Sequence, residues 1–320
     1  SAGAGRGDAP QRMPAAGRIH ALQGRLEAAL AVRSDGAADL ASAEHDLQSL
    51  NGMCRTATYH ELPRRLGRSI RDQLATTDNA RYAQRCQQVL LLAMRARLRA
   101  PVPPGRDDAL TDELLEAAER VLRTIEARDD TYHLDADVFV KDLACFTTRM
   151  VPCGVYVVDC FGGWPRRYLA LPTLRRLPAN WLFTRRAGGL GPLAQLHLHT
   201  PMLAQFSEAG RDRSFALIAA LLREQPRLRG VMGSAWYYDP RVAGISPHLA
   251  YLRDAPAQHG AMIVCVGPTD AASASALARS ATRRRLYESG DYTPREYALF
   301  WPREPFLAWV DTRKSQSRKE

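Results

Sequence analysis

The 320-residue chain has no long apolar run. Its densest apolar stretch, residues 89–94, is far shorter than the roughly 18 apolar residues that a membrane span needs. We therefore expect no membrane insertion and no membrane partner. Residues 1–18, rich in Gly, Ala, Arg and Pro, also lack an apolar export signal. They are predicted to form a disordered tail on a cytoplasmic protein.

Cysteine is scarce and irregularly spaced. The sequence contains no Cys-x-x-Cys pair, so it predicts neither a disulfide framework nor a zinc ribbon. Reduced thiols fit a cytoplasmic location. The six cysteines are Cys54, Cys86, Cys145, Cys153, Cys160 and Cys265.

Acidic residues are absent from residues 161–207, in a chain whose formal net charge is +10. A stretch of this kind carries a positive potential suited to phosphates or RNA. Lysine is also rare, since only Lys141, Lys314 and Lys319 occur. A GC-rich coding sequence alone can produce such a preference for arginine, so a polyanion surface and a compositional effect both remain open. The arginines of the stretch are Arg166, Arg167, Arg175, Arg176, Arg185 and Arg186.

Apolar residues in the first half recur at three- and four-residue steps, which is the spacing of amphipathic helices. We predict a helical domain over residues 19–150. Within it, residues 64–99 are rich in arginine and residues 107–142 are rich in acids. We expect these two segments to pack against each other through their opposite charges.

The period changes to that of strands after Val151. The predicted fold class is therefore α/β in the α+β sense, with a helical amino-terminal region followed by a mixed, largely antiparallel sheet flanked by helices. The sheet domain is expected over residues 151–312, with a basic tail over 313–320. Strands are expected near residues 155–158, 164–171, 193–199, 228–238, 261–266, 297–301 and 306–310, with one helix over 272–288.

A glycine-containing segment, residues 208–214, is expected to form a loop between a strand and the amino terminus of a helix. Free backbone N–H groups and the helix dipole favour anions at such a place. Gly210 would let the backbone approach a pyrophosphate, Arg211 and Arg213 would add charge-assisted hydrogen bonds, and Ser214 would open the helix. The alternative is a capped, solvated turn.

This order of elements, over roughly residues 193–310, resembles the GNAT superfamily of N-acetyltransferases. In that family a long strand is followed by a pyrophosphate-binding loop, a helix, a splayed strand and a helix that carries a tyrosine. Residues 281–292 look like the family's late Leu-Tyr-x-x-Gly-aromatic element, although Asp291 precedes Tyr292 and residues 239–270 would be an insertion. The resemblance implies that Tyr287 is the general acid that reprotonates the leaving thiolate.

The resemblance also implies the reaction. It would be transfer of an acyl group from acyl-coenzyme A, or of an aminoacyl group from aminoacyl-tRNA, to a small-molecule amine, without a tightly bound cofactor. The acid-free arginine stretch would suit tRNA. A general base is needed to deprotonate the amine, and His199, His197 or Asp239 could serve. The sequence does not determine the oligomeric state.

Three other functions remain open. His197 and His199 lie two residues apart on a predicted strand, so both could ligate iron on one face if a carboxylate completed the site. Cys160 could act as a thiol nucleophile with His199 as its base. The chain could also be a noncatalytic RNA-binding protein.

Overall fold

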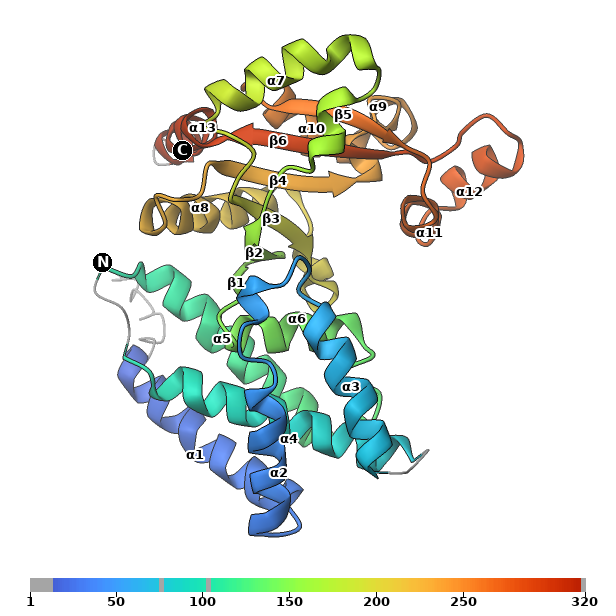
Figure 1. Cartoon of the computed structure of the whole chain (residues 1–320). Coiled ribbons are helices and arrows are strands. Elements are labelled where there is room, and N and C mark those ends of the chain that lie inside the picture. The colour runs from blue at the N-terminus through green and yellow to red at the C-terminus, as the bar shows by residue number, and fades with distance from the viewer. Residues whose placement is uncertain (1–13, 75–77, 102–104, 318–320) are drawn as a thin grey trace, which may run out of the picture.

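The structure is a computed structural model that describes residues 14–74, 78–101 and 105–317. Helices occupy the described chain up to Phe146, and a sheet flanked by helices begins at Met150 (Figure 1). This arrangement confirms the predicted fold class. No helix in these ranges is long and apolar enough to cross a membrane.

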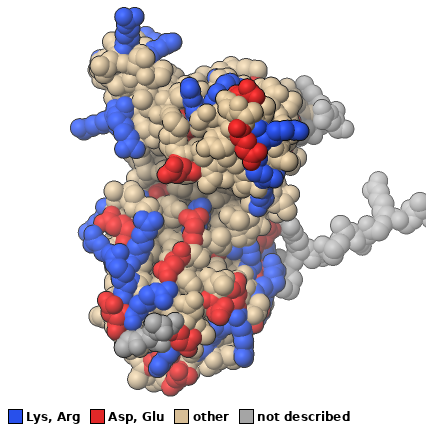
Figure 2. Space-filling view, turned by 90° about the vertical axis from the view of Figure 1, so that its right-hand side faces the viewer, with Lys and Arg blue, Asp and Glu red and all other residues tan. Residues whose placement is uncertain are grey.

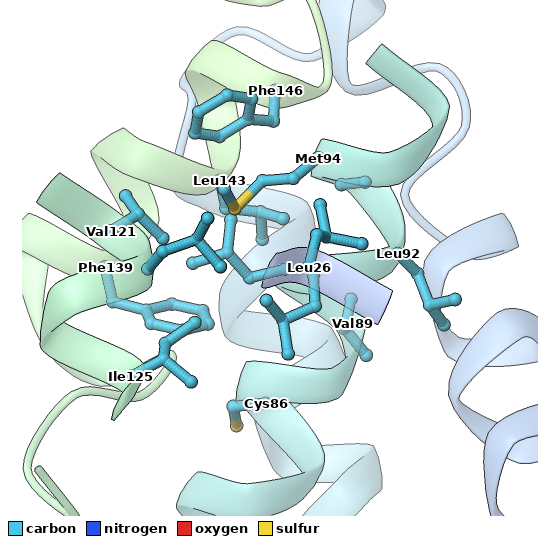
Figure 3. Close-up of a cluster of buried hydrophobic side chains, with 14 of the residues drawn as sticks. Leu26, Cys86, Val89, Leu92, Met94, Val121, Ile125, Phe139, Leu143 and Phe146 are labelled. Carbon is cyan, nitrogen blue, oxygen red and sulfur yellow. The ribbon is translucent and has the colours of Figure 1, made fainter. Parts of the chain in front are cut away.

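The amino-terminal region is built around one central helix. Its buried residues, among them Val89 and Met94, meet apolar side chains of the surrounding helices (Figure 3). Leu26, Val121 and Leu143 contribute to this core from three of those helices. The helices are α1 (Ala15–Arg33), α2 (Ala37–Gln48), α3 (Glu61–Leu74), the central α4 (Asn79–Arg99), α5 (Asp108–Glu126) and α6 (Asp137–Phe146).

The charges of this region are matched, but not mainly as predicted. Arg95 and Arg99 of α4 form ion pairs with Glu27 of α1 rather than with the acidic segment 107–142. The pair Arg71–Asp135 does join the two predicted segments. Helices distant in sequence enclose α4, so its arginines reach carboxylates that a local charge pattern cannot identify. Red and blue side chains are accordingly interleaved over the lower, helical part of the molecule in Figure 2.

The sheet contains six strands in the order β1-β2-β3-β4-β6-β5. All neighbouring pairs are antiparallel except β3 and β4, which run parallel. A parallel pair requires a crossover, which here contains helix α8 (Glu208–Glu224). The strands are β1 (Met150–Cys153), β2 (Tyr156–Gly162), β3 (Leu193–Leu198), β4 (Gly230–Ala235), β5 (Met262–Gly267) and β6 (Glu296–Pro302).

Several predicted elements are corrected. The strand expected at 306–310 is part of helix α13 (Arg303–Ser317), because Phe306, Trp309 and Val310 are buried at helical spacing. The strand expected at 164–171 is mostly a 3-10 helix, Arg166–Ala170. The helix expected at 272–288 is two helices, α11 (Asp270–Leu277) and α12 (Ala281–Glu288), because Ser280 caps the second one.

The ends of the chain also differ from expectation. Helix α1 begins at Ala15, inside the predicted disordered tail, and residues 1–13 lie outside the described residues. Most of the predicted basic tail, 313–317, belongs to α13, whereas residues 318–320 lie outside the description.

A buried ion pair joins the helical region to the sheet. Arg149, just before β1, donates from Nε and Nη2 to the carboxylate of Asp159 in β2, at 2.7–3.0 Å. Its Nη1 donates to the carbonyls of Met53 and Thr56, at 2.6 and 2.9 Å. The Arg149 side chain is completely buried. It therefore fixes the connection between α2 and α3 onto the edge of the sheet.

Candidate functional site

The two parallel strands at the centre of the sheet separate soon after they meet. Their register contains only the partners Ala194–Val231 and Gln195–Met232. Beyond these residues a cavity of about 240 Å³ opens between the strand ends. Its lining includes Leu196 and Leu198 of β3, Gly233 and Ser234 of β4, and the aromatic residues Trp236, Tyr237 and Tyr238 that follow β4. Figure 1 shows β3 and β4 next to each other in the middle of the sheet.

A histidine and an aspartate meet at the end of β3. His199 follows the last residue of this strand, and its Nε2 lies 3.1 Å from Oδ1 of Asp142 on α6. Arg120 of α5 donates two hydrogen bonds to the same carboxylate, and the Tyr132 hydroxyl donates a third at 2.6 Å. His199 and Asp142 are both buried.

These contacts set the protonation of the pair. Burial alone would raise the pKa of Asp142, but the hydrogen bonds from His199 and Arg120 lower it below its usual value. The carboxylate is therefore an anion at neutral pH, and it can accept a hydrogen bond from an Nε2–H group of His199. In the neutral imidazole, Nδ1 is then left with its lone pair. This nitrogen is buried and has no hydrogen-bond partner among the described residues.

His199 and Asp142 line a second cavity, of about 300 Å³, between the helical region and the sheet. Its lining includes three carboxylates, Glu113, Glu116 and Glu119, together with Arg120 and Arg123. Burial raises the pKa of Glu113, against the opposing effect of Arg213. Glu113 forms an ion pair with Arg213 and Glu119 with Arg18, so the carboxylates of this cavity are largely matched by arginines.

The predicted phosphate loop is absent. Residues 208–214 form the first turns of α8, and Ser207 is the cap, because its Oγ accepts a hydrogen bond from the Gly210 N–H at 3.1 Å. A Cβ atom on Gly210 would lie 1.8 Å from the Gln205 carbonyl oxygen. Glycine is therefore required at this position, because the backbone of the preceding turn lies too close for a Cβ atom.

The polar residues of this segment are engaged within the chain. Arg211 is buried and donates to Asp212 and to the Tyr251 carbonyl. Arg213 forms an ion pair with Glu113. Ser214 donates to the Gly210 carbonyl and accepts from the Val155 N–H. These polar groups therefore have partners within the chain, and their role in binding a donor phosphate stays a prediction.

We expect Gly210→Ala to destabilise the protein by about 1–3 kcal/mol, because the new methyl group would overlap the Gln205 carbonyl. Gly24→Ala is the matched control. Gly24 lies inside α1 with open space around its missing Cβ, so alanine should stabilise the protein by up to about 1 kcal/mol. Urea unfolding measures both changes. Equal stability of the two variants would contradict the described contact.

The other predicted catalytic residues lie away from His199. Asp239 is buried, and its carboxylate accepts hydrogen bonds from Nε and Nη2 of Arg241. Tyr287 lies on α12 with 46% of its surface exposed, and it lines neither cavity. Of these three predicted catalytic residues, His199 is the one that lines either of the two cavities described above.

Two of the alternative functions, the iron site and the Cys160 nucleophile, lack the neighbouring groups that they need among the described residues. Among the described residues, no group of three or more His, Cys, Asp or Glu is arranged to hold a metal ion, so His197 and His199 have no third ligand there. Burial raises the pKa of the Cys160 thiol to about 12. Its sulfur is near the Gln225 side chain, at 3.9 Å.

His197 should make stability depend on pH. Burial, helped by the nearby Lys141 ammonium, lowers the pKa of its imidazole to about 4. In the unfolded chain this pKa is about 6.5, so the unfolded state binds more protons between these values. The contribution of His197 to the free energy of unfolding is therefore full above about pH 6.5 and is lost as the pH decreases toward 4. The urea midpoint of His197→Gln should fall less than that of the wild type over this range. Parallel pH curves would contradict the assignment.

Sequence reasoning missed the partners of His199. Asp142, Arg120 and Tyr132 come from separate segments, and only the fold brings them together. One signal was present, since Asp142 lies within the apolar sequence of α6, where an unpaired carboxylate would be costly.

No protein-family model, curated protein or solved structure matches this chain.

Proposed function

We propose that the chain is an acyltransferase that moves an acyl or aminoacyl group from acyl-coenzyme A or aminoacyl-tRNA to a small-molecule amine. The observation that carries this proposal is the pair of parallel strands that separate around a cavity, with a buried histidine base at the end of one of them. A strand, a helix and a neighbouring parallel strand in this order also match the element order of the GNAT superfamily, which supports the same reaction.

The donor would lie in the cavity between β3 and β4, where Leu196 and Leu198 offer apolar contact to a thioester arm. The acceptor would enter the cavity that His199 lines. These two cavities are lined by consecutive residues, Leu198 and His199. The proposal requires that they join around the end of β3, because the side chains of consecutive strand residues point to opposite faces of a sheet. Binding both substrates there would supply proximity, which is a large part of catalysis in transfer reactions.

The chemistry is a nucleophilic acyl substitution. The amine attacks the donor carbonyl, a C–N bond forms, and the bond from the carbonyl carbon to sulfur or oxygen breaks. The Nδ1 atom of His199 takes the proton from the attacking nitrogen, while Asp142 stabilises the imidazolium that forms. The leaving thiolate or alkoxide then takes up a proton, which the His199 imidazolium can return. Tyr287 as its source stays a prediction, which undiminished turnover of Tyr287→Phe would remove.

The two donor classes differ in their response to salt. Most nonspecific RNA affinity comes from phosphate contacts that release counterions, so binding of aminoacyl-tRNA should weaken steeply as salt rises. Binding of a coenzyme A thioester inside an apolar cavity should change much less.

Ser234→Trp tests the donor site. Ser234 is exposed at the rim of the cavity between β3 and β4, so an indole there should fill the cavity without disturbing the core. We expect transfer of a labelled acyl group to a mixture of amines to fall at least about tenfold. Ser69→Trp, on the exposed face of α3, is the matched control and should keep the wild-type rate. Full activity of Ser234→Trp would refute the assigned donor site.

A further inference from the structure

Helix α7 (Leu177–Arg186) leaves several large apolar side chains exposed to solvent. The side that faces the protein carries Asn180 and Thr184, which are buried, and Asn180 donates hydrogen bonds to the carbonyls of Leu169 and Leu171. Leu177 and Trp181 lie on the same stripe of the helix as Asn180 and Thr184, yet they are 42% and 49% exposed. Hydrogen bonds from Asn180 and the packing of Phe183 against Phe300 therefore anchor the helix, while Leu177, Trp181 and Leu182 remain partly in solvent.

The exposed apolar groups form one surface. Leu174 precedes the helix with 77% of its surface exposed, and Leu177, Trp181 and Leu182 are each more than two-fifths exposed. These four make up most of the large hydrophobic residues that the described part of the chain exposes. Isolated exposed leucines are ordinary, but a cluster of this kind marks a binding surface.

The charges around this cluster have one sign. Residues 161–207 contain no acid, and the arginines of the segment are exposed. In the described structure no carboxylate pairs with any of the four that adjoin the cluster, Arg175, Arg176, Arg185 and Arg186. At the upper end of the molecule, where Figure 1 places α7, blue side chains project from a tan surface in Figure 2. The surface therefore suits an anionic partner.

A groove of about 660 Å³ runs beside the helix. Leu182 and Phe183 give it apolar walls, and Arg186 and Arg229 supply cations. The one carboxylate in its lining, Glu304, lies 3.8 Å from Arg303. The groove thus repeats, next to α7, the combination of apolar and cationic groups found on the helix itself.

We propose that the segment 166–187 is a docking surface for an anionic phospholipid bilayer, with α7 lying in the plane of the interface. Leu174, Leu177, Trp181 and Leu182 would enter the boundary between headgroups and acyl chains, and the arginines would contact lipid phosphates. This proposal does not depend on the proposed reaction. It differs from the sequence-based expectation of no membrane partner, because that expectation came from the lack of a spanning run, and a helix that lies on a surface needs none.

Other partners fit these groups less well. RNA would be bound by the arginines and could stack on Trp181, but it offers nothing to three exposed leucines. A second copy of the chain would bring arginines against arginines across the same face. An anionic bilayer satisfies both features at once.

The test is sedimentation of the full chain with vesicles of phosphatidylcholine alone or mixed with phosphatidylserine. We expect binding to the mixed vesicles only. Arg175→Gln with Arg176→Gln should lower the partition coefficient about 10- to 30-fold. Trp181→Ser should lower it about tenfold, because the aromatic anchor is lost. Arg64→Gln with Arg68→Gln, which removes two exposed arginines of α3, is the charge-matched control and should bind like the wild type.

Three outcomes would overturn the proposal. The first is absence of binding to the mixed vesicles. The second is equal loss of binding in the α3 control, which would mean that net charge alone drives adsorption. The third is a protein that does not bind vesicles but binds RNA, with RNA binding weakened by Arg175→Gln together with Arg176→Gln. The surface would then be an RNA site.

Discussion

Replacing His199 by alanine should lower the rate of acyl transfer by about 10²- to 10⁴-fold, the range that a positioned general base contributes. The reason is geometric. Asp142 accepts a hydrogen bond from Nε2–H of His199, so Nδ1 is the atom that would take a proton from the acceptor amine. Added imidazole should restore part of the rate in the variant, because the deleted ring leaves space in the cavity.

The control for this result is His20→Ala. His20 is exposed on α1 and should be dispensable. Circular dichroism and urea unfolding establish whether His199→Ala is folded. A folded His199→Ala variant with the wild-type rate would contradict the assigned base, and so would a rate loss that imidazole leaves unchanged while Asp142→Asn remains fully active.

Replacing Arg149 by alanine should cost about 3–5 kcal/mol of the free energy of unfolding, which is a large share of the total stability of a typical protein. The substitution leaves the buried carboxylate of Asp159 without its cation, and the carbonyls of Met53 and Thr56 without their donor. Urea unfolding followed by circular dichroism measures the change.

Two companion variants separate burial from charge. Arg25→Ala removes an exposed pair with Glu126, on which both side chains are about two-fifths exposed, so it should cost less than about 1 kcal/mol. The double variant Arg149→Met with Asp159→Leu removes both buried charges and should recover much of the loss. If Arg149→Ala is as stable as Arg25→Ala, the buried pair does not hold the junction.

Secondary structure could be predicted from the sequence where a local pattern of apolar residues determines it. Strand β3 (Leu193–Leu198) lies close to its predicted range of 193–199, because a strand pattern is set by which side chains are buried. The predicted range of this strand also put His199 at the strand end, which is where the structure has it. In α13, Phe306 and Val310 were misread as a strand, because a short apolar segment fits both periods.

The candidate site was less accessible to sequence reasoning. Gly210 and Arg211 have the composition of a phosphate loop, but the cap at Ser207 starts the helix before them. The Asp142–His199 pair joins residues 57 positions apart, on elements of two different regions. A contact of this kind leaves no periodic signal, so only the fold reveals it.

The most direct test of the central claim is native mass spectrometry of the purified chain with acetyl-coenzyme A or charged tRNA, each at two salt concentrations. The proposed function predicts a one-to-one adduct with one donor class, present in Ser69→Trp and lost in Ser234→Trp. Retention at high salt would identify the coenzyme A thioester, and loss at high salt would identify the tRNA. A wild-type chain that forms no adduct with either donor, or an adduct that survives in Ser234→Trp, would contradict it.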